Sequence, residues 1–392
     1  MPIKSVFCFI LIASVAFTAI GLFVFRIRVP SDNHALSLMR ETLSAGKLVG
    51  VVNNSLVTDA PVPLRRRDEL QVDRVTDYYL IQEHETTRQL NDTDRHCRKG
   101  SFQLNNDGVC HRWLTCKDIQ YNVTPIKRIG EGTIKKVYLA RWKEYNVSLL
   151  RLQHMDWNSQ LLFSSLANNM QQFQPSPFVT QFLGFCPSIP ALVTEYHRFG
   201  SLNKINKILK EQNEDSVLTR FRISLDYVKI INFLHSSPTG THVMCDSGNL
   251  NKTLSQFLVT SDLHIIVNDL DFLPVADSSK RVVTNCGSWG IESGENGKFA
   301  APEQLIWSSI KRKKYYKPVK GFNEKSDIWK IPTVVDYLMG ESFYGKHAKF
   351  KLSTIHQKCR SMDPKLRPTA AEVLKVYYYV QQRLELMMTN NV

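Results

Sequence analysis

Two aspartates, Asp246 and Asp269, have the residue type and the setting that phosphoryl transfer requires. Between them lie a loop and two short apolar runs, 257–259 and 265–267, the second of which is typical of a β-strand. Phosphoryl transfer depends mainly on positioning and on neutralising negative charge, so two carboxylates facing one cleft are its minimum equipment. One can accept the proton of the acceptor hydroxyl, and the other can hold a divalent cation on the nucleotide phosphates. A lone aspartate in a loop is more often a turn or cap residue, so this interpretation depends on the rest of the chain.

The residues beside each aspartate are similar to protein-kinase motifs but depart from them. Met244-Cys245-Asp246 stands where kinases have His-Arg-Asp, and Asp269-Leu270-Asp271 stands where they have Asp-Phe-Gly. By this comparison Asp246 is the predicted catalytic base, and Asp269 is the predicted ligand of the metal ion bound to ATP.

A glycine-rich stretch upstream is similar to the loop that covers the nucleotide phosphates in kinases. It follows the pattern G-x-G-x-x-G-x-V, except that Lys135 occupies the third glycine position. Gly130 and Gly132 lack a Cβ, so their backbone amides can approach phosphate oxygens. Val137 is expected to cover the adenine. A lone G-x-G is usually a hairpin turn, but the strand pattern that follows this one favours a nucleotide site.

The lysine that kinases carry on the next strand is missing, because that strand ends in Leu150. Either the site is inactive or another cation binds the phosphates. Side chains alternate along a strand, so Lys135 lies on the face of Val137 and points into the cleft, whereas Lys136 points away. We therefore predict that Lys135 supplies the missing ammonium group. Asp156 is the candidate for its carboxylate partner, since no glutamate occurs in the helical stretch that follows.

Two further stretches predict the elements that lead into this site. Thr194-Glu195-Tyr196-His197 is typical of a hinge, and we expect Glu195, Tyr196 and His197 to contact the nucleotide. Apolar residues at spacings of three and four predict an amphipathic helix that delivers the chain to Asp246. They are Leu218, Phe221, Leu225, Val228, Ile231 and Leu234.

Three downstream motifs occur in the order found in kinase large lobes. They are Ala-Pro-Glu at 301–303, Asp-Ile-Trp at 327–329 and Arg-Pro-Thr at 367–369. The comparison predicts a structural ion pair between Glu303 and Arg367. Together the motifs predict an α+β, two-lobed, protein-kinase-like fold at 121–392, with a small, mostly β lobe to about residue 195 and a large, mostly α lobe after it.

The second metal ligand has two candidates. Asn251 follows Asp246 at the spacing of the kinase signature, but Asn251-Lys252-Thr253 is also an N-glycosylation sequon, and a glycan there would exclude a metal. The interval from Asp246 to Asp269 is longer than usual, which implies an insertion. Placing the insertion before Thr253 puts Gln256 at the asparagine position, and we favour Gln256 because its amide oxygen is chemically equivalent.

The N-terminal region predicts membrane attachment. Residues 5–25 carry no charge and, at about 1.5 Å per residue, span a hydrocarbon core of roughly 30 Å. We interpret them as an uncleaved signal anchor after a cytosolic tail at 1–4, with a cleaved signal peptide as the rival. Residues 26–95 are typical of a stem or linker, and 96–120 form a cysteine-bearing extension.

The orientation of this anchor is predicted differently by different signals. Arg26 and Arg28 follow the span, and a count of positive charges would place the large part of the chain in the cytosol. Sequons and clustered cysteines without a Cys-x-x-Cys pattern instead favour the lumen and disulfide bonds. The candidate glycosylation sites are Asn53, Asn91, Asn146 and Asn251, while Asn122 is a poor acceptor because Pro125 follows its sequon. We prefer the lumen.

The net charge of +14 indicates an anionic partner, such as nucleotide phosphate, an acidic glycan or a membrane surface. Because no RNA- or DNA-binding signature accompanies the charge, we expect no nucleic-acid partner.

Taken as a set from about residue 97 to 382, the motifs resemble the protein O-mannose kinase family of secretory-pathway glycan kinases. The Met-Cys-Asp and Asp-Leu-Asp motifs are specific to that family. The matching stretches are 129–139, 142–144, 194–197, 226–246, 253–256, 268–271, 301–305 and 327–332.

The resemblance implies ATP and Mg²⁺ or Mn²⁺ as cofactors. It implies phosphorylation of the 6-hydroxyl of a mannose that is O-linked to α-dystroglycan and extended by N-acetylglucosamine and N-acetylgalactosamine, a step before the laminin-binding glycan is built. It also implies a single-pass type II protein of the endoplasmic reticulum membrane, with the kinase domain in the lumen. The rivals are a glycan-binding pseudokinase without catalysis and a cytosol-facing protein kinase.

A lumenal domain would contain oxidised cysteines. We expect Cys97, Cys110 and Cys116 to form disulfides, with Cys186 as the candidate partner of Cys116. Cys245, beside the predicted base, is expected to stay a free thiol.

Overall fold

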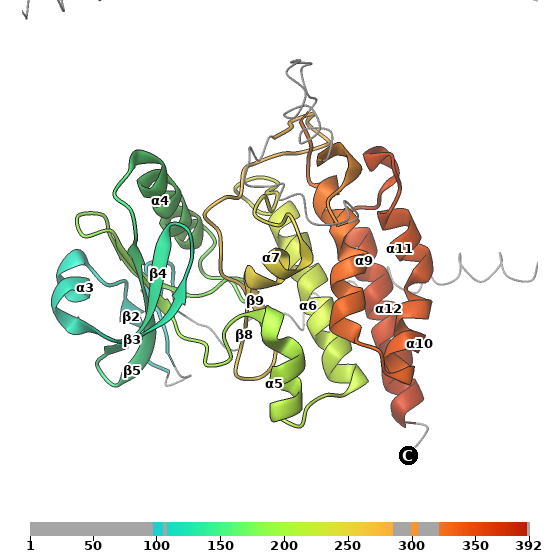
Figure 1. Cartoon of the computed structure of the whole chain (residues 1–392), viewed down its shortest axis with the longest axis horizontal. Helices are drawn as coiled ribbons and strands as arrows, with labels where there is room; N and C mark the ends of the chain where they lie inside the picture. Colours follow the sequence, from blue (N-terminus) through green and yellow to red (C-terminus); the bar gives the residue numbers. More distant parts are fainter. Residues whose placement is uncertain (1–96, 105–107, 285–298, 305–320, 390–392) are drawn as a thin grey trace, which may run out of the picture. The chain divides into compact units, whose positions relative to one another are not determined.

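The computed structural model describes residues 97–104, 108–284, 299–304 and 321–389 (Figure 1). The chain divides into two compact units, 1–81 and 82–392, and every described residue belongs to the second. The predicted tail, anchor and stem, together with Asn53 and Asn91, lie outside the described residues. Within the described ranges no helix has the length and apolar character needed to cross a membrane.

The first lobe is built on a five-stranded antiparallel sheet with strand order β3-β4-β5-β7-β6. The strands are β3 (Val123–Glu131), β4 (Lys135–Trp142), β5 (Tyr145–Leu152), β6 (Phe182–Cys186) and β7 (Ala191–Glu195). Helix α4 (Trp157–Gln172) contacts β5 and β6. The glycine-rich stretch therefore comprises the end of β3, which contains Gly130, the turn at 132–134 and the start of β4.

A short N-terminal segment covers this sheet. It contains β1 (Ser101–Phe102), β2 (His111–Arg112) and α3 (Cys116–Asn122), and Thr115 caps α3 through a capping box with Asp118. Apolar side chains from this segment share one core with the sheet. The main members of that core are Phe102, Leu114, Ile119, Trp142, Val147, Leu149, Leu183 and Val193.

Two disulfides hold the N-terminal segment to itself and to the sheet. Cys97 pairs with Cys110, and Cys116 pairs with Cys186. The expected oxidation of the N-terminal cysteines and the candidate pairing with β6 are both confirmed. The expectation of a free thiol at Cys245 is wrong: Cys245 is disulfide-bonded, and its partner lies outside the described residues.

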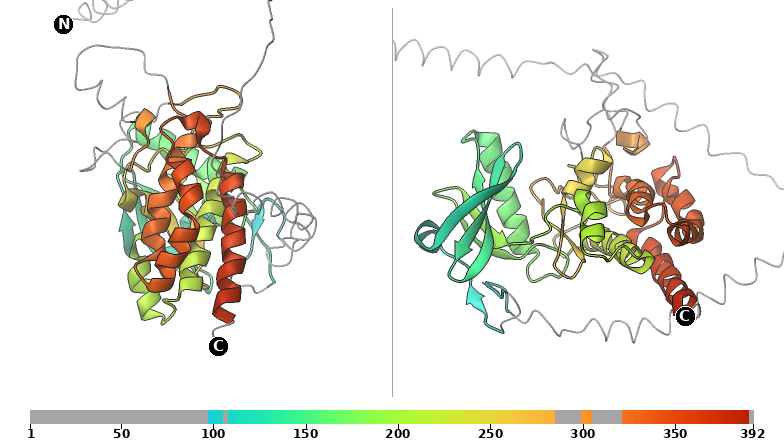
Figure 2. Two further views of the ribbon diagram at one scale, coloured as in Figure 1. Left: turned by 90° about the vertical axis from the view of Figure 1, so that its right-hand side faces the viewer. Right: turned by 60° about the horizontal axis from the view of Figure 1, so that its bottom comes forward.

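The second lobe is mainly helical and follows β7. Its helices and short strands are η2 (Leu202–Lys204), α5 (Ile205–Glu211), α6 (Val217–His235), α7 (Leu250–Ser255), β8 (Phe257–Val259), β9 (Ile265–Val267), α9 (Lys325–Met339), α10 (Phe343–Lys351), α11 (Ser353–Cys359), η3 (Pro364–Leu366) and α12 (Ala370–Thr389). Helix α6 packs against both α9 and α12 (Figure 2). The predicted α+β fold with a sheet lobe and a helical lobe is confirmed.

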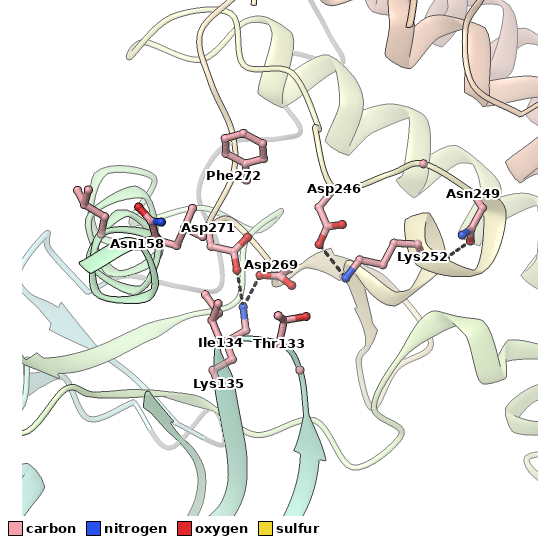
Figure 3. Close-up of a pocket in the computed structure, with 14 residues that line it drawn as sticks. Thr133, Ile134, Lys135, Asn158, Asp246, Asn249, Lys252, Asp269, Asp271 and Phe272 are labelled. Carbon is pink, nitrogen blue, oxygen red and sulfur yellow. Dashed lines mark hydrogen bonds and ion pairs between the residues drawn. The ribbon is translucent and has the colours of Figure 1, made fainter. Parts of the chain in front are cut away.

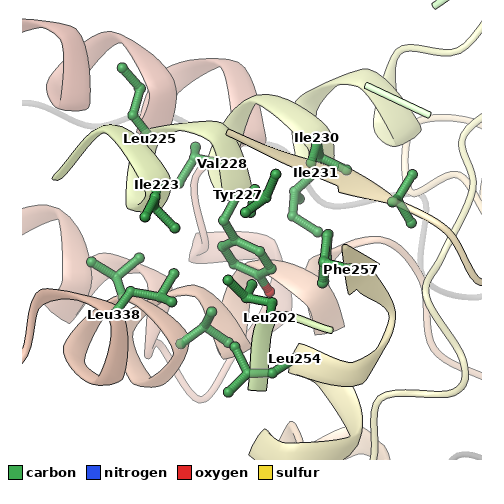
Figure 4. Close-up of a cluster of buried hydrophobic side chains, with 14 of the residues drawn as sticks. Leu202, Ile223, Leu225, Tyr227, Val228, Ile230, Ile231, Leu254, Phe257 and Leu338 are labelled. Atoms are coloured by element: carbon green, nitrogen blue, oxygen red, sulfur yellow. The ribbon is translucent and has the colours of Figure 1, made fainter. Parts of the chain in front are cut away.

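Helix α6 is more deeply buried than the predicted stripe requires. Leu218 is 37% exposed, but the other members of the stripe are buried, and so are Ile223, Tyr227 and Ile230 on its remaining faces. Tyr227 lies in the centre of this core with its ring 5.4 Å from that of Phe257 (Figure 4). A helix that is apolar on most sides is a core helix, and α6 thus gives the following loop a rigid starting point.

Candidate active site

Helix α9 holds the loop that carries Asp246 in place. The backbone N–H of Met244 donates to Oδ2 of Asp327 at 3.0 Å, and Nε2 of His235 lies 3.4 Å from the same oxygen. Asp327 is fully buried, and an unpaired buried carboxylate would be costly. The Asp-Ile-Trp motif thus positions the start of the loop.

A buried lysine extends this support to the residue after Asp246. Nζ of Lys330 donates to Oγ of Ser247 at 2.6 Å and lies 3.3 Å from Oδ1 of Asp327. The Ser247 hydroxyl in turn donates to the carbonyl of Met244. Helix α9 therefore holds both sides of Asp246, and nothing in the motif comparison assigned Lys330 this role.

Lys135 projects from the first position of β4 into the same region (Figure 3). Its ammonium donates to Oδ1 of Asp269 and, at 3.1 Å, to Oδ2 of Asp271. Burial opposes the charged form, but the two carboxylates together raise the pKa of Lys135 well above its usual value, so the group is a cation. Lys136 lies on the other face of the strand, 4.0 Å from Glu131.

Asp156 does not pair with Lys135. Its side chain instead accepts a hydrogen bond from the backbone N–H of Ser159 at 3.0 Å and caps the first turn of α4. Helix capping is the commonest use of an aspartate at this position, and the proposed pairing is therefore wrong.

Three carboxylates converge beside the ammonium group. Ligand oxygens of Asp246, Asp269 and Asp271 lie within 4.8 Å of one another. Carboxylate oxygens are the ligands that Mg²⁺ and Mn²⁺ prefer, so this set fits a divalent metal ion. The comparison with kinase motifs assigns a role only to the first aspartate of Asp-Leu-Asp and gives none to Asp271. Its signal in the sequence was a carboxylate at the position where kinases have glycine.

The two amide candidates for the metal lie elsewhere. Gln256 donates through Nε2 to the Lys252 carbonyl at 3.1 Å, and Asn251 accepts from Asn203 at 3.3 Å. Neither residue lines the cavity that contains the three carboxylates. Asp271 is therefore the better-placed second metal ligand beside Asp269.

The carboxylates differ in their affinity for protons. Burial and the charge of Asp269 raise the pKa of Asp271 to about 6. Burial acts on Asp269 in the same direction, but the ammonium of Lys135 outweighs it and lowers the pKa of Asp269. Burial also raises the pKa of Asp246, although Lys252 lies 2.7 Å from its Oδ2 and opposes that change. Asp246 thus has more basic character than an exposed aspartate.

The predicted nucleotide residues lie on the sheet side of this cluster. Gly130 pairs with Val137 across β3 and β4. A Cβ added at Gly130 would meet Val137 at 3.5 Å, and the nearest contact at Gly132 would be 3.8 Å. Both positions could hold a side chain in the free protein, so packing within the chain does not require glycine at either one.

The predicted hinge residues do not line the cavity that contains the three carboxylates. Oε1 of Glu195 accepts from the backbone N–H of Gln181 at 2.8 Å and lies 3.3 Å from Nε2 of His197, without hydrogen-bond geometry. The Glu195 side chain is thus turned toward β6. No contact of Tyr196 or His197 in the described residues tests their predicted approach to the nucleotide.

A cavity of about 520 Å³ surrounds the carboxylates (Figure 3). Its walls come from the glycine-rich turn, the start of α4, the Asp246 loop with α7, and the Asp-Leu-Asp segment. The lining residues are Gly132, Thr133, Ile134, Lys135, Asn158, Leu161, Leu162, Asp246, Gly248, Asn249, Lys252, Asp269, Asp271 and Phe272. Base, cation and metal-binding groups therefore share one open volume.

The remaining predicted pairs and sites fall outside the cavity. Arg367 binds Glu303 through two parallel contacts of 2.5 and 2.8 Å, so the structural ion pair is present. Asn146 and Asn251 are exposed, as a glycosylated asparagine must be. Their modification remains a prediction.

Comparison with known proteins places these features in a family. The chain is 39% identical to Protein O-mannose kinase of Macaca fascicularis over 294 residues, which are 74% of this chain and 82% of that protein. It is 38% identical to the human protein of that name over 74% of this chain and 81% of the relative, and 38% identical to the Xenopus laevis one over 72% and 79%. No protein-family model matches the chain. The chain belongs to the protein O-mannose kinase family and is an ATP-dependent kinase.

Proposed function

We propose that this kinase transfers the γ-phosphoryl group of ATP to the 6-hydroxyl of a mannose that is O-linked to α-dystroglycan. The acceptor would be the trisaccharide of N-acetylgalactosamine, N-acetylglucosamine and mannose. The relatives named Protein O-mannose kinase support a mannose acceptor. The observation that carries the proposal is the convergence of Asp246, Lys135 and the Asp269–Asp271 pair on one cavity.

The residues divide the reaction between them. Asp246 accepts the proton of the mannose 6-hydroxyl, and the oxygen of that hydroxyl bonds to the γ-phosphorus of ATP. At the same time the bond between the γ-phosphorus and the β–γ bridging oxygen breaks, and ADP is released. Lys135 neutralises charge on the phosphates. Asp269 and Asp271 would hold Mg²⁺ or Mn²⁺, and such an ion supplies charge neutralisation for the phosphates when bound.

A glycan-binding pseudokinase is the second candidate, because the lysine that kinases carry on the strand equivalent to β5 is absent. Its replacement by Lys135, held by the two metal-binding carboxylates, supports catalysis instead. We also propose a type II protein of the endoplasmic reticulum membrane with this domain in the lumen. The disulfides favour an oxidising compartment, and sensitivity of the expressed protein to endoglycosidase would test the orientation.

The direct experiment follows radiolabelled phosphate from ATP. With full-length enzyme we expect label on the mannose of a synthetic O-mannosyl trisaccharide and none on peptide serine or tyrosine. Asp246→Asn should abolish the transfer while leaving trisaccharide binding intact. Label on peptide alone would contradict the glycan acceptor, and binding without transfer by the unmodified protein would favour the pseudokinase.

A further inference from the structure

Helix α4 contains no charged residue. In protein kinases a lysine of the small lobe pairs with a glutamate of the helix beside it, and this ion pair must be in place for phosphoryl transfer. The sequence of α4 offers no carboxylate for such a pair, and the ammonium of Lys135 binds Asp269 and Asp271 instead. Any polar connection between α4 and the active site must therefore use an uncharged side chain.

Asn169 of α4 makes a connection of this kind. Its Nδ2 donates a hydrogen bond to the backbone carbonyl of Leu270 at 2.7 Å. Leu270 is fully buried and lies between the two carboxylates that bind Lys135. A buried carbonyl without a partner is costly, so this contact holds the middle of the Asp-Leu-Asp segment against α4.

The two ends of the segment are bound to the helical lobe. The N–H groups of Asn268 and Asp269 donate to the Gln256 carbonyl at 2.8 and 3.3 Å. On the far side, Nδ1 of His242 donates to the Leu273 carbonyl at 2.9 Å. These contacts fix the ends of the segment to one lobe, while the contact from α4 fixes its centre to the other lobe.

The side chain of Asn169 is itself held in a fixed position. Phe163 and Met170 of the same helix are buried in the core that also contains Leu270. Asp156 caps the first turn of the helix. An amide on a helix that is capped at one end and packed along one side keeps its direction, so the hydrogen bond costs little conformational freedom when it forms.

We propose that Asn169 is a positioning residue that sets the spacing of Asp269 and Asp271 around Lys135. This inference rests on the metal-binding role proposed for the two aspartates. The hydrogen bond ties the segment to α4 and so takes over the coupling that the lysine–glutamate pair provides in other kinases. The metal site is complete only while α4 holds its present position.

The test replaces Asn169 by leucine, which keeps the volume of the side chain but removes the donor. In full-length Asn169→Leu without metal or nucleotide, hydrogen exchange at the amides of Asn268 and Asp269 should rise about tenfold, because the segment opens more often. The dissociation constant for Mn²⁺, measured from the EPR signal of the free ion, should also rise about tenfold. In phosphate transfer, kcat should fall about tenfold while KM for the trisaccharide stays within about twofold.

Two controls separate this effect from general damage to the fold. Asn168→Leu makes the same substitution at an exposed position one residue earlier in α4. Gln181→Met removes a different amide-to-carbonyl hydrogen bond in the same lobe, from Nε2 of Gln181 to the carbonyl of Gln103 at 2.8 Å. We expect Gln181→Met to lower the thermal stability, and we expect both controls to leave the exchange at 268–269 and the affinity for Mn²⁺ unchanged.

The positioning role and the proposed function fail in different ways. If exchange at 268–269 in Asn169→Leu matches that in the controls, the positioning role is wrong and the proposed function stands. A rise in exchange spread evenly over the domain would assign Asn169 to general stability and would also overturn the positioning role. If the unmodified enzyme binds no Mn²⁺, the metal-binding role of the two aspartates falls, and the inference falls with it. If the expected changes in exchange and in Mn²⁺ affinity occur but no phosphate reaches the trisaccharide, the inference stands and the mannose acceptor is wrong.

Discussion

At the scale of single residues, Asp271 completes the candidate metal site. It lies with Asp246 and Asp269 within 4.8 Å and also binds Lys135. Asp271→Asn keeps the shape but removes the charge, so we expect the Mg²⁺ concentration for half-maximal activity to rise about tenfold or more. The measurement is a Mg²⁺ titration of phosphate transfer at saturating ATP.

Gln256→Met provides the comparison for that titration. Gln256 bonds within α7 and does not line the cavity, so its replacement should lower thermal stability but leave the Mg²⁺ requirement within about twofold. A larger shift for Gln256→Met than for Asp271→Asn would restore the amide as the second metal ligand.

The residue-level predictions that succeeded rest on local geometry. The facing of Lys135 follows from strand alternation, which needs only the strand and its register. Its partner could not be obtained that way, because Asp269 and Asp271 reach it from the other lobe. Asp156 is the candidate only because the helical stretch after it contains no glutamate. Its real role, the cap of α4, follows from a local rule that the sequence also contains.

At the scale of elements, α9 positions the loop that carries Asp246. Ser247→Ala removes the hydroxyl that joins Lys330 of α9 to the residue after the base. A small displacement of a catalytic group is costly, so we expect kcat to fall about tenfold while KM for ATP stays within about twofold. Steady-state phosphate transfer measures both constants.

Ser224→Ala is the matched control for this change. Ser224 is equally buried, but its hydroxyl donates to a carbonyl within its own helix, α6, and has no path to Asp246. Its replacement should leave kcat unchanged. Equal losses of kcat in the two variants would show that the effect reflects general packing, not support of the loop.

The order and type of the elements could be predicted, but their depth of burial could not. The spacing of apolar residues located α6, yet Tyr227 and Ile230 lie buried outside the expected stripe. Their burial follows from the contacts of α6 with both α9 and α12, which only the assembled lobe contains. The disulfide at Cys245 could not be predicted either, because the spacing of cysteines in a sequence does not fix their pairing.

At the scale of the whole molecule, a partly buried histidine links the stability of the helical lobe to pH. Nε2 of His356 in α11 lies 2.8 Å from the hydroxyl of Tyr377 in α12. Burial lowers the pKa of His356 to about 4 from an ordinary value of 6.5. Between these values the unfolded chain binds a proton that the folded chain does not, so stability is complete above pH 6.5 and is lost as the pH falls toward 4.

This linkage predicts a smaller pH dependence in His356→Gln. At about 1.4 kcal/mol per pKa unit, the histidine should account for about 2 kcal/mol of the stability lost between pH 7 and pH 5. Denaturant unfolding at the two pH values measures this loss. His154→Gln, at an exposed position, should retain the full dependence of the unmodified protein. An unchanged dependence in His356→Gln would assign the acid sensitivity to other groups.

We infer that Lys135 of β4 replaces, in a working kinase cleft, the lysine that kinases carry on the strand equivalent to β5. Lys135 and Lys136 are adjacent lysines on opposite faces, with side chains 10% and 36% exposed, so each serves as the control for the other. The measurement is kcat for phosphate transfer to the trisaccharide at saturating ATP and Mg²⁺, with thermal unfolding to verify that each variant is folded. Lys135→Met should lower kcat at least about a hundredfold, and Lys136→Met should leave it within a few-fold. Equal losses in the two variants, or a larger loss at Lys136, would contradict the account.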